Sequence, residues 1–349
     1  MPILAGKSIG QNGLGLMRKS LYTQRLETRG ANLLLGMTLK GDVIPEEKTF
    51  AVLEAALKAG ANVWNGADFY GTPDYNTLHL MNRYFTAYPE DADKVVLTVK
   101  SGIADMSTFA MDCSPAAIRG FVDRANAILD GKKKIDLFGC GRVDPKVPIE
   151  ETVRALGELV KEEKIGGIQL SEVSASTIRR AAQVATIDIV EAEISLWATN
   201  GFENGVAETC AELGITLVAL TPLGAGMLTG RIKSPDDLPA NDYHRFFPRF
   251  QRENLHINLK LVHTLSQLAE KRGCTSAELA LSWFRAQSRL PRMPVIVPVF
   301  GARSEERVAE NTRDIDLSDS DLEEIRSILD SCPVVGSRHP PIAAKLCEY

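Results

Sequence analysis

Short apolar runs alternate with amphipathic, helix-periodic stretches from residue 46 onward, and this alternation limits the possible folds more than any other feature. Repeated strand–helix units of this kind build a parallel sheet whose strands are covered on both faces, so the runs are rich in Val, Ile and Leu. We expect seven strands at residues 62–65, 95–100, 135–138, 167–170, 188–193, 215–220 and 295–298, and an eighth within residues 33–39. Eight such strands close a (β/α)8 TIM barrel, which is an α/β fold.

The helix candidates between these runs begin with recognisable signals. Residues 46–59 follow Pro45, Ser114 and Pro115 suit a cap and a first turn, and residues 150–163 and 174–183 are also expected to be helical. No Pro-, Gly- or Ser-rich linker divides the chain, so we expect residues 1–349 to form one domain. Residues 233–254 combine aromatic and basic side chains, and we expect a long loop there that covers the substrate or the cofactor.

Composition excludes several classes of function. The net charge of −5 offers no basic surface for nucleic acid. No run approaches the roughly 20 apolar residues of a membrane-spanning helix, the first residues lack signal-peptide features, and the six cysteines show no paired spacing. We therefore expect a cytoplasmic protein with free thiols. The histidines form no HxH or HExxH pattern and no GxSxG occurs, so neither a metal site nor a serine hydrolase is predicted.

Two polar residues lie where a barrel places its reacting groups, at the carboxyl ends of strands. Tyr70 closely follows the run at 62–65, and Lys100 ends the run at 95–100. A tyrosine whose pKa is lowered by a nearby cation can act as a general acid toward a carbonyl oxygen. Taken alone, the pair is a weak signal, because such residues are more often solvated or structural.

Motifs along nearly the whole chain follow one another in a fixed order: GLGLM, the separated GMT, NGADFYG, VLTVKSG, IDLFGCGRVDP, VPIEET, GGIQLSEVSA, TPLGAGMLTGR and PVFGARSEERVAEN. In these motifs the sequence resembles the aldo-keto reductases, and several of them resemble the fungal pyridoxal reductase branch more closely still. The resemblance implies an enzyme that reduces a small-molecule aldehyde to an alcohol with NADPH, with pyridoxal to pyridoxine as the expected reaction. It leaves the direction in the cell and the oligomeric state open.

The resemblance implies catalytic roles for three residues. Tyr70 is the acid, Lys100 is its partner, and the family's catalytic aspartate falls on Asn65. The amide oxygen of Asn65 can accept a hydrogen bond from Lys100, and we expect a lysine without a carboxylate partner to polarise the phenol more freely. The family's histidine falls on Gly141, which we expect to leave room for a bulkier, ring-substituted aldehyde while removing one donor to its oxygen.

Cofactor binding through a Rossmann fingerprint is not predicted, because residues 13–18 and 224–229 both lack its last glycine. The resemblance implies instead a pyrophosphate-binding set in the glycine-rich stretch 221–231: Thr221, Leu223, Gly224 and Gly226. It also implies a nicotinamide-binding set, in which the first three face the carboxamide and the last stacks on the ring: Ser171, Glu172, Glu191 and Trp197.

A further set follows the last strand, at the start of a helix, in the position where the family binds the adenosine 2′-phosphate: Arg303, Ser304, Arg307, Glu310 and Asn311. Two guanidinium groups, a hydroxyl and a helix N-terminus suit a phosphate and favour NADP over NAD. In isolation the same residues would indicate only a solvated helix face.

Alternatives to the pyridoxal reaction stay open at this point. Barrels of this family also serve as NADPH-binding regulatory subunits of ion channels, and a chain with Asn65 and Gly141 in place of two catalytic groups could be one of these. The substrate could also be another aldehyde or a ketone, because loops shape the pocket.

Residues 18–35 separate GLGLM from GMT and are interpreted as an insertion, for which translated intron sequence is one origin. Without them the sequence would continue as GLGLMGMTLKGD, which is closer to the family pattern. We expect their deletion to preserve the fold and to raise stability or activity.

Overall fold

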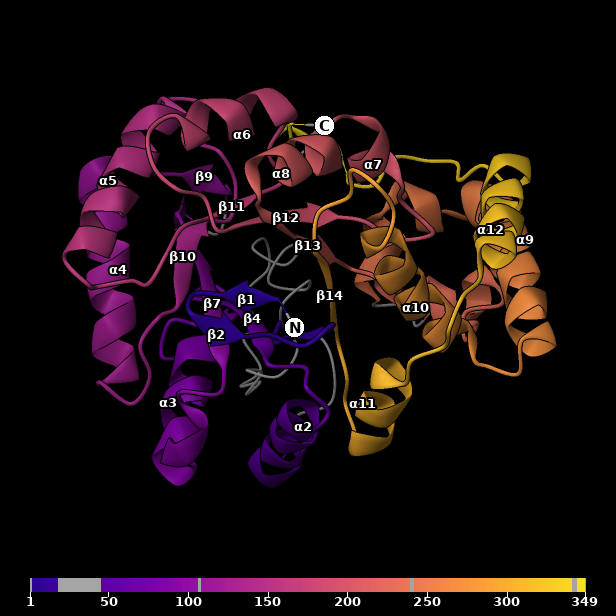
Figure 1. The fold of residues 1–349 in the computed structure, drawn as a ribbon, viewed down its shortest axis with the longest axis horizontal. Coiled ribbons are helices and arrows are strands. Elements are labelled where there is room, and N and C mark those ends of the chain that lie inside the picture. Colours follow the sequence, from indigo (N-terminus) through magenta and orange to yellow (C-terminus); the bar gives the residue numbers. More distant parts are fainter. Residues whose placement is uncertain (1, 18–44, 106–107, 239–241, 341–343, 349) are drawn as a thin grey trace.

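The computed structural model describes residues 2–17, 45–105, 108–238, 242–340 and 344–348. Within them, eight parallel strands form one sheet in the order β10-β7-β4-β3-β14-β13-β12-β11, and Phe138 of β10 also pairs in parallel with Ile168 beside β11. The strands are β3 Gly13–Gly15, β4 Val63–Ala67, β7 Val96–Ser101, β10 Leu137–Cys140, β11 Gln169–Ser171, β12 Ile189–Glu193, β13 Thr216–Leu220 and β14 Ile296–Phe300. The sheet therefore closes into the predicted barrel (Figure 1).

Helices surround this barrel in alternation with its strands (Figure 1). The described helices are α2 Glu46–Lys58, α3 Thr77–Ala87, α4 Pro115–Leu129, α5 Ile149–Lys161, α6 Ala175–Ala182, α7 Asn200–Glu203, α8 Val206–Leu213, α9 Arg252–Lys271, α10 Ser276–Ser288, α11 Glu305–Thr312 and α12 Asp319–Ser331. Ser114 caps α4 and Ser174 caps α6, each by accepting a hydrogen bond from a backbone N–H of the first turn. The predicted helix starts are confirmed.

The hydrophobic core has two parts, one on each side of the sheet. The larger part lies between the strands and the surrounding helices and includes Trp64, Tyr84 and Phe284. The smaller part fills the barrel interior with Val63, Val96, Leu137, Ile189, Val218, Val297 and their neighbours. The antiparallel hairpin of β1 Ile3–Leu4 and β2 Lys7–Ser8 supplies Leu4 to this inner cluster. The end of the barrel away from the β1–β2 hairpin is the carboxyl end of the strands. Polar side chains lie there.

The predicted position of the first strand is wrong. Its place between β14 and β4 is taken by β3, in which Gly13 pairs with Val299 on one side and Val63 on the other. A Cβ added at Gly13 would lie 2.7 Å from the Val63 carbonyl oxygen, so the close approach of the strands requires glycine. The observed first strand is the beginning of the GLGLM motif, Gly13–Gly15. Residues 33–39 and 18–35 lie outside the described residues.

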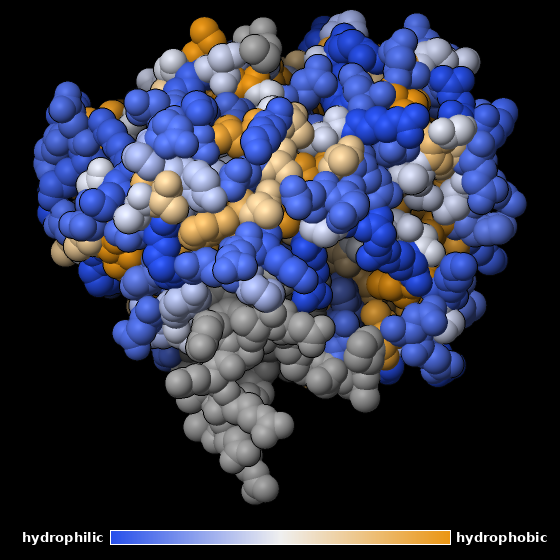
Figure 2. Space-filling model, turned by 90° about the horizontal axis from the view of Figure 1, so that it is seen from below, coloured by the Kyte–Doolittle hydropathy of each residue, from blue (hydrophilic) through white to orange (hydrophobic). Residues whose placement is uncertain are grey.

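The outer surface is mainly hydrophilic in the view of Figure 2. Hydrophilic side chains cover most of the face that Figure 2 shows, and hydrophobic residues appear between them. No helix among the described residues is long and apolar enough to cross a membrane.

The predicted long loop contains three short 3-10 segments, η3 Pro235–Asp237, η4 Tyr243–Phe246 and η5 Pro248–Phe250.

Candidate active site

Two neighbouring strands bring Tyr70 and Lys100 together at the carboxyl end of the barrel. Strands β4 and β7 pair directly, with Ala67 beside Lys100. Tyr70 lies in the turn after β4, where its backbone N–H donates to the Ala67 carbonyl over 3.2 Å. The ammonium nitrogen of Lys100 lies 5.6 Å from the centroid of the Tyr70 ring. The pair thus has the placement that the acid and its cation partner need, although its catalytic role stays a prediction.

The Lys100 ammonium is buried together with a carboxylate from across the barrel. Its Nζ lies 2.9 Å from Oε2 of Glu191 and donates a hydrogen bond of 2.5 Å to Oδ1 of Asn65. The side chains of Lys100 and Glu191 are only 3% and 0% exposed. Burial alone would lower the pKa of Lys100, but the Glu191 carboxylate and the nearby Tyr70 together outweigh it and the pKa is raised. The expectation of a lysine without a carboxylate partner is therefore wrong.

Asn65 joins these two charged groups through both ends of its amide. Its oxygen accepts the hydrogen bond from Lys100, and its nitrogen donates to Oε1 of Glu191 and, over 3.0 Å, to the hydroxyl of Thr98. An amide can accept and donate at once, whereas a carboxylate only accepts. The Asn65 contact with Lys100 is the one expected from the sequence, and the contact with Glu191 was not foreseen. We call Asn65, Lys100 and Glu191 the lysine cluster.

Phe69 fills the space beside Gly141, where the family pattern has a histidine. A Cβ added at Gly141 would lie 3.3 Å from the tip of the Phe69 ring, closer than ordinary van der Waals contact. The same ring meets Tyr70 edge to face, with centroids 5.1 Å apart. The room expected at this point for a bulkier aldehyde is therefore taken up by an aromatic side chain of the protein itself.

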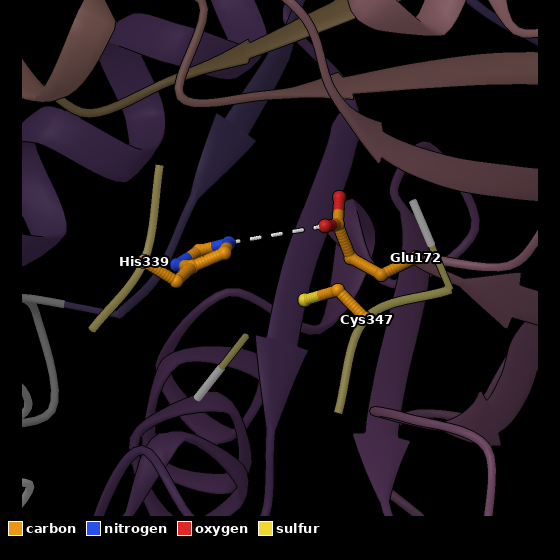
Figure 3. A group of neighbouring side chains, drawn as sticks. All are labelled: Glu172, His339 and Cys347. Atoms are coloured by element: carbon orange, nitrogen blue, oxygen red, sulfur yellow. Dashed lines mark ion pairs between the residues drawn. The ribbon is translucent and has the colours of Figure 1, made fainter. Parts of the chain in front are cut away.

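Glu172 directly follows β11 and is bound by the C-terminal segment of the chain. Its side chain is 1% exposed, Oε1 accepts a hydrogen bond of 2.6 Å from the backbone N–H of Glu193, and Oε2 accepts one of 3.2 Å from Arg338. The His339 ring nitrogen Nε2 lies 3.9 Å from the same oxygen (Figure 3). Burial would raise the pKa of the Glu172 carboxyl, but His339, Arg142 and Arg338 hold it well below its usual range.

The end of the chain adds two more contacts to this region. Cys347 lies beside Glu172 and His339 (Figure 3), with the ligand atoms of all three within 4.8 Å of one another. The Glu348 carboxylate accepts hydrogen bonds from the backbone N–H of Ser174, over 2.7 Å, and from the hydroxyl of Thr177, over 3.0 Å. We call Glu172, Arg338, His339 and Cys347 the tail cluster.

A metal ion does not suit the tail cluster, although Glu, His and Cys are common ligands. Burial would lower the pKa of His339, but Cys347 and the nearby carboxylates of Glu172 and Glu193 raise it to about 9, so the ring is protonated at neutral pH. A divalent cation would meet this imidazolium and the guanidinium groups of Arg338 and Arg142, which already balance Glu172. The cluster is better described as the attachment of the C-terminal segment to the barrel.

The predicted pyrophosphate and carboxamide sites offer polar and open features that fit a dinucleotide. The Ser171 hydroxyl, at the end of β11, is buried and has no hydrogen-bond partner among the described residues. Gly224 and Gly226 have φ values of 57° and 101°, and a Cβ added at Gly226 would meet nothing within 4 Å. Thr221 and Leu223 lie in the same turn after β13. An orphaned hydroxyl suits a carboxamide, and an open glycine backbone suits a phosphate.

Trp197 and the loop at 233–254 pack together. Trp197 is 3% exposed, and its ring centroid lies 6.1 Å from that of Phe250 in the loop. Arg249 donates a hydrogen bond of 2.8 Å from Nη1 to the Trp197 carbonyl. The loop therefore reaches the residue that was expected to stack on the nicotinamide.

The predicted 2′-phosphate set lies at the start of α11. Ser304 is the N-cap and accepts a hydrogen bond of 3.4 Å from the Arg307 N–H. The Arg307 guanidinium is paired with Glu310, and the Asn311 amide donates over 3.4 Å to the Gly301 carbonyl. Arg303 is exposed at the same helix start. A phosphate at this place would compete with Glu310 for Arg307.

Sequence reasoning missed Phe69, Arg338, His339 and Cys347 as parts of this region. The last three come from the C-terminal segment, and no pattern in the sequence indicates where that segment lies. A usable signal existed for Glu191: a carboxylate expected from the family is lost at position 65 while an extra one appears on another strand of the same barrel.

Comparison with known proteins defines the class. The sequence model of the Aldo/keto reductase family matches residues 32–330, and this chain belongs to that family. Among curated relatives, the Probable pyridoxal reductase 2 of Schizosaccharomyces pombe is 36% identical over 348 residues, covering 97% of both chains. The Putative pyridoxal reductase of Saccharomyces cerevisiae is 32% identical over 328 residues, covering 88% of this chain and 94% of the relative.

Two further proteins support the family and the fold. The Aldo-keto reductase yakc [NADP(+)] of Schizosaccharomyces pombe is 35% identical over 303 residues, covering 85% of this chain and 86% of the relative. Among solved structures, the glycerol dehydrogenase of Gluconobacter oxydans matches with a TM-score of 0.75 at 21% identity, covering 94% of each chain. This structural likeness shows the barrel fold alone.

Proposed function

We propose that this protein reduces an aldehyde to an alcohol with NADPH, and that pyridoxal, giving pyridoxine, is its substrate. The observation that carries the proposal is the position of Tyr70 beside the buried Lys100 ammonium at the carboxyl end of the barrel. The substrate is suggested by two curated relatives whose names contain pyridoxal reductase, and the cofactor by one whose name contains NADP(+).

Each of three side chains has its own role in the proposed reaction. Tyr70 donates its phenolic proton to the carbonyl oxygen, so that the C=O bond becomes C–OH. Bound NADPH would supply the hydride that the carbonyl carbon takes up. Lys100 stabilises the phenolate that remains on Tyr70 until a proton from solvent restores the phenol. Phe69 is the side chain beside Tyr70 that would limit the shape of the aldehyde.

The cofactor would be held by groups from three parts of the barrel rim. Ser171 suits the carboxamide because its hydroxyl is buried and orphaned among the described residues. The turn from Thr221 to Gly226 suits the pyrophosphate, and the start of α11 with Arg303 and Arg307 suits the 2′-phosphate.

The test compares substrates and one variant. Steady-state NADPH consumption is measured with pyridoxal and with a generic aromatic aldehyde, and NADPH binding is followed separately by fluorescence. Tyr70→Phe should lower turnover by about 10²- to 10⁴-fold while NADPH still binds, because the proton is needed only in the transition state.

Three outcomes decide the proposal. A large preference for pyridoxal supports the named substrate, and a preference for the other aldehyde would replace it. If Tyr70→Phe retained more than about a tenth of wild-type turnover, Tyr70 would not be the acid. Tight NADPH binding with no turnover on either aldehyde would favour the regulatory-subunit alternative.

A further inference from the structure

We propose that Glu191 is a positioning residue that holds the Lys100 ammonium for the reaction, taking over from β12 the charge that the family's aspartate would supply at position 65 on β4. The inference rests on the proposed function, because it concerns the same Tyr70 and Lys100. It replaces the carboxamide contact expected for Glu191 from the sequence.

Both oxygens of Glu191 are already in contact with side chains of the barrel interior. Oε2 lies 2.9 Å from the Lys100 nitrogen, and Oε1 accepts a hydrogen bond from Asn65. The carboxylate is fully buried, so it cannot exchange these partners for water. A carboxamide N–H would have to share Oε2 with the Lys100 ammonium, which already lies 2.9 Å from it.

The buried Lys100 ammonium needs one negative charge and no more. An uncompensated charge in the interior is strongly destabilising, and a second carboxylate would leave one charge in excess. Within the lysine cluster, Glu191 supplies that single charge and Asn65 is neutral. The neutral amide at position 65 and the carboxylate at position 191 therefore belong together: the negative charge expected at position 65 is supplied from position 191 instead.

An amide suits position 65 because it can contact both charged groups at once. The Asn65 oxygen faces the Lys100 ammonium, while its nitrogen faces Glu191 and the Thr98 hydroxyl. With Glu191 in place, an aspartate at 65 would set two carboxylates against each other. An asparagine instead links the cation to the anion and fixes both.

The charge on Lys100 links this arrangement to the reaction. Lys100 is useful to Tyr70 only while it is charged, and the charged and titratable groups that act on it are Glu191, Tyr70 and Arg142. Burial and Arg142 both favour the neutral amine, and Glu191 opposes them. Removing the carboxylate should thus make Lys100 lose its proton at a lower pH.

The experiment moves the charge between the two strands. Four proteins are compared with the wild type: Glu191→Gln, Glu191→Asp, Asn65→Asp and the double variant Asn65→Asp with Glu191→Gln. For each, kcat and KM with pyridoxal are measured from pH 6 to 10, with NADPH affinity by fluorescence and the melting temperature at the same pH values.

We expect Glu191→Gln to lower kcat at pH 7 on the order of 10- to 100-fold and to shift the alkaline fall of kcat to lower pH, with NADPH affinity changed by no more than about twofold. Glu191→Asp should keep part of the activity. Asn65→Asp alone should also lose activity, and the double variant should return to within about threefold of the wild type in kcat and in melting temperature.

A matched control removes another buried carboxylate. Glu278 lies in α10, is 4% exposed and pairs with Arg313 at 3.1 Å. Glu278→Gln should lower the melting temperature without moving the pH profile, and adding Asn65→Asp should not rescue it.

The inference is overturned if Glu191→Gln leaves the pH profile of kcat unchanged, or if the double variant is no better than the worse single one in both kcat and melting temperature. A failure of the proposed function looks different: no variant and no wild-type protein would then reduce an aldehyde. In that event the recovery of melting temperature and of its pH dependence in the double variant still decides whether Glu191 holds Lys100.

Discussion

Two buried carboxylates lie next to each other on the barrel rim and are balanced in different ways. Glu191 belongs to β12, Glu172 directly follows β11, and the N–H of Glu172 donates to the Glu191 carbonyl over 2.8 Å. Both are at most 1% exposed. Glu191 is neutralised by Lys100 from the opposite wall of the barrel, whereas Glu172 is neutralised by Arg338 and His339 from the C-terminal segment.

The difference shows how the origin of a counter-ion decides what a buried carboxylate does. A buried acid needs a cation in either case. Lys100 is part of a strand and lies beside Tyr70, so its pair with Glu191 can serve the reaction. Arg338 and His339 lie on a segment that is otherwise remote in sequence, so their contacts with Glu172 fix that segment to the barrel. We therefore expect the lysine cluster to govern rate and the tail cluster to govern stability.

The strongest test of this division removes one cation from each cluster. Lys100→Met should lower kcat on the order of 100-fold or more, because the phenolate on Tyr70 loses its counter-charge. Arg338→Met should change kcat by no more than about threefold but lower the melting temperature by about 3 to 10 °C, because Glu172 loses a buried partner. Both are measured by steady-state kinetics with pyridoxal and by thermal unfolding.

The pair of variants also shows how the comparison could fail. If Arg338→Met reduced kcat as strongly as Lys100→Met, the tail cluster would belong to the catalytic machinery. Arg119→Met is a suitable control, since Arg119 pairs with Glu162 on the surface, where both side chains are about 40% exposed. Its loss should have little effect on rate or stability.

The pH dependence of stability should separate the clusters further. The pKa of His339 is raised to about 9 in the folded protein, because Cys347 and the nearby carboxylates of Glu172 and Glu193 outweigh burial. A histidine with a raised pKa contributes stability that is fully present below its unfolded pKa, near 6.5, and is lost as the pH rises through about 9. The groups facing it are Glu172, Glu193, Cys347 and Arg338.

The measurement is the melting temperature of wild-type protein and of His339→Gln at pH 6 and pH 10. The wild type should be the more stable of the two at pH 6, by about 2 to 6 °C, and the gap should close toward pH 10. A gap that stayed constant over this range would show that His339 acts through packing and not through its charge.

The sequence predicts most of the fold and the proximity of Tyr70 and Lys100. The physical reasons differ from residue to residue. Strands such as β7 and β13 are recognisable because a parallel strand covered on both faces is rich in apolar residues. The first strand was misplaced because Gly13 and Gly15 give β3 almost no side chains to recognise, whereas residues 33–39 are apolar.

Contacts within the site also differ in whether the order of the strands predicts them. Tyr70 and Lys100 could be paired in advance, because the carboxyl ends of neighbouring parallel strands meet at one edge. The contact of Lys100 with Glu191 crosses the barrel, and it depends on the lengths and directions of side chains that no periodicity gives. The contact of Phe69 with the space at Gly141 depends in the same way on one ring's orientation.

Asp68 is a half-buried carboxylate, and it sharpens the comparison because its side chain contacts a hydroxyl. The Ser101 hydroxyl donates to Oδ2 of Asp68 over 2.5 Å. Burial raises the pKa of this carboxyl from 3.8 to about 6, and the Ser101 hydrogen bond and the charge of Arg124 only partly oppose the rise. Glu172 has a close cation and a lowered pKa. Asp68 has a raised pKa, and no cation contacts it among the described residues.

The sign of the resulting effect on stability is opposite to that of a salt-bridged acid, and it defines the smallest of the expected changes. A carboxyl whose folded pKa is raised stabilises the fold most below its unfolded pKa of 3.8, and this advantage is lost as the pH rises through about 6. Asp68→Asn keeps an acceptor for Ser101 without the charge, so it should raise the melting temperature at pH 8 by about 1 to 3 °C and have no such effect near pH 4. Asp123→Asn serves as the control, since Asp123 is about half exposed and pairs with Lys164, and it should give no gain at pH 8. A gain of equal size for Asp68→Asn at both pH values would mean that the amide improves packing, and a loss at pH 8 would mean that the Asp68 charge is needed where it lies.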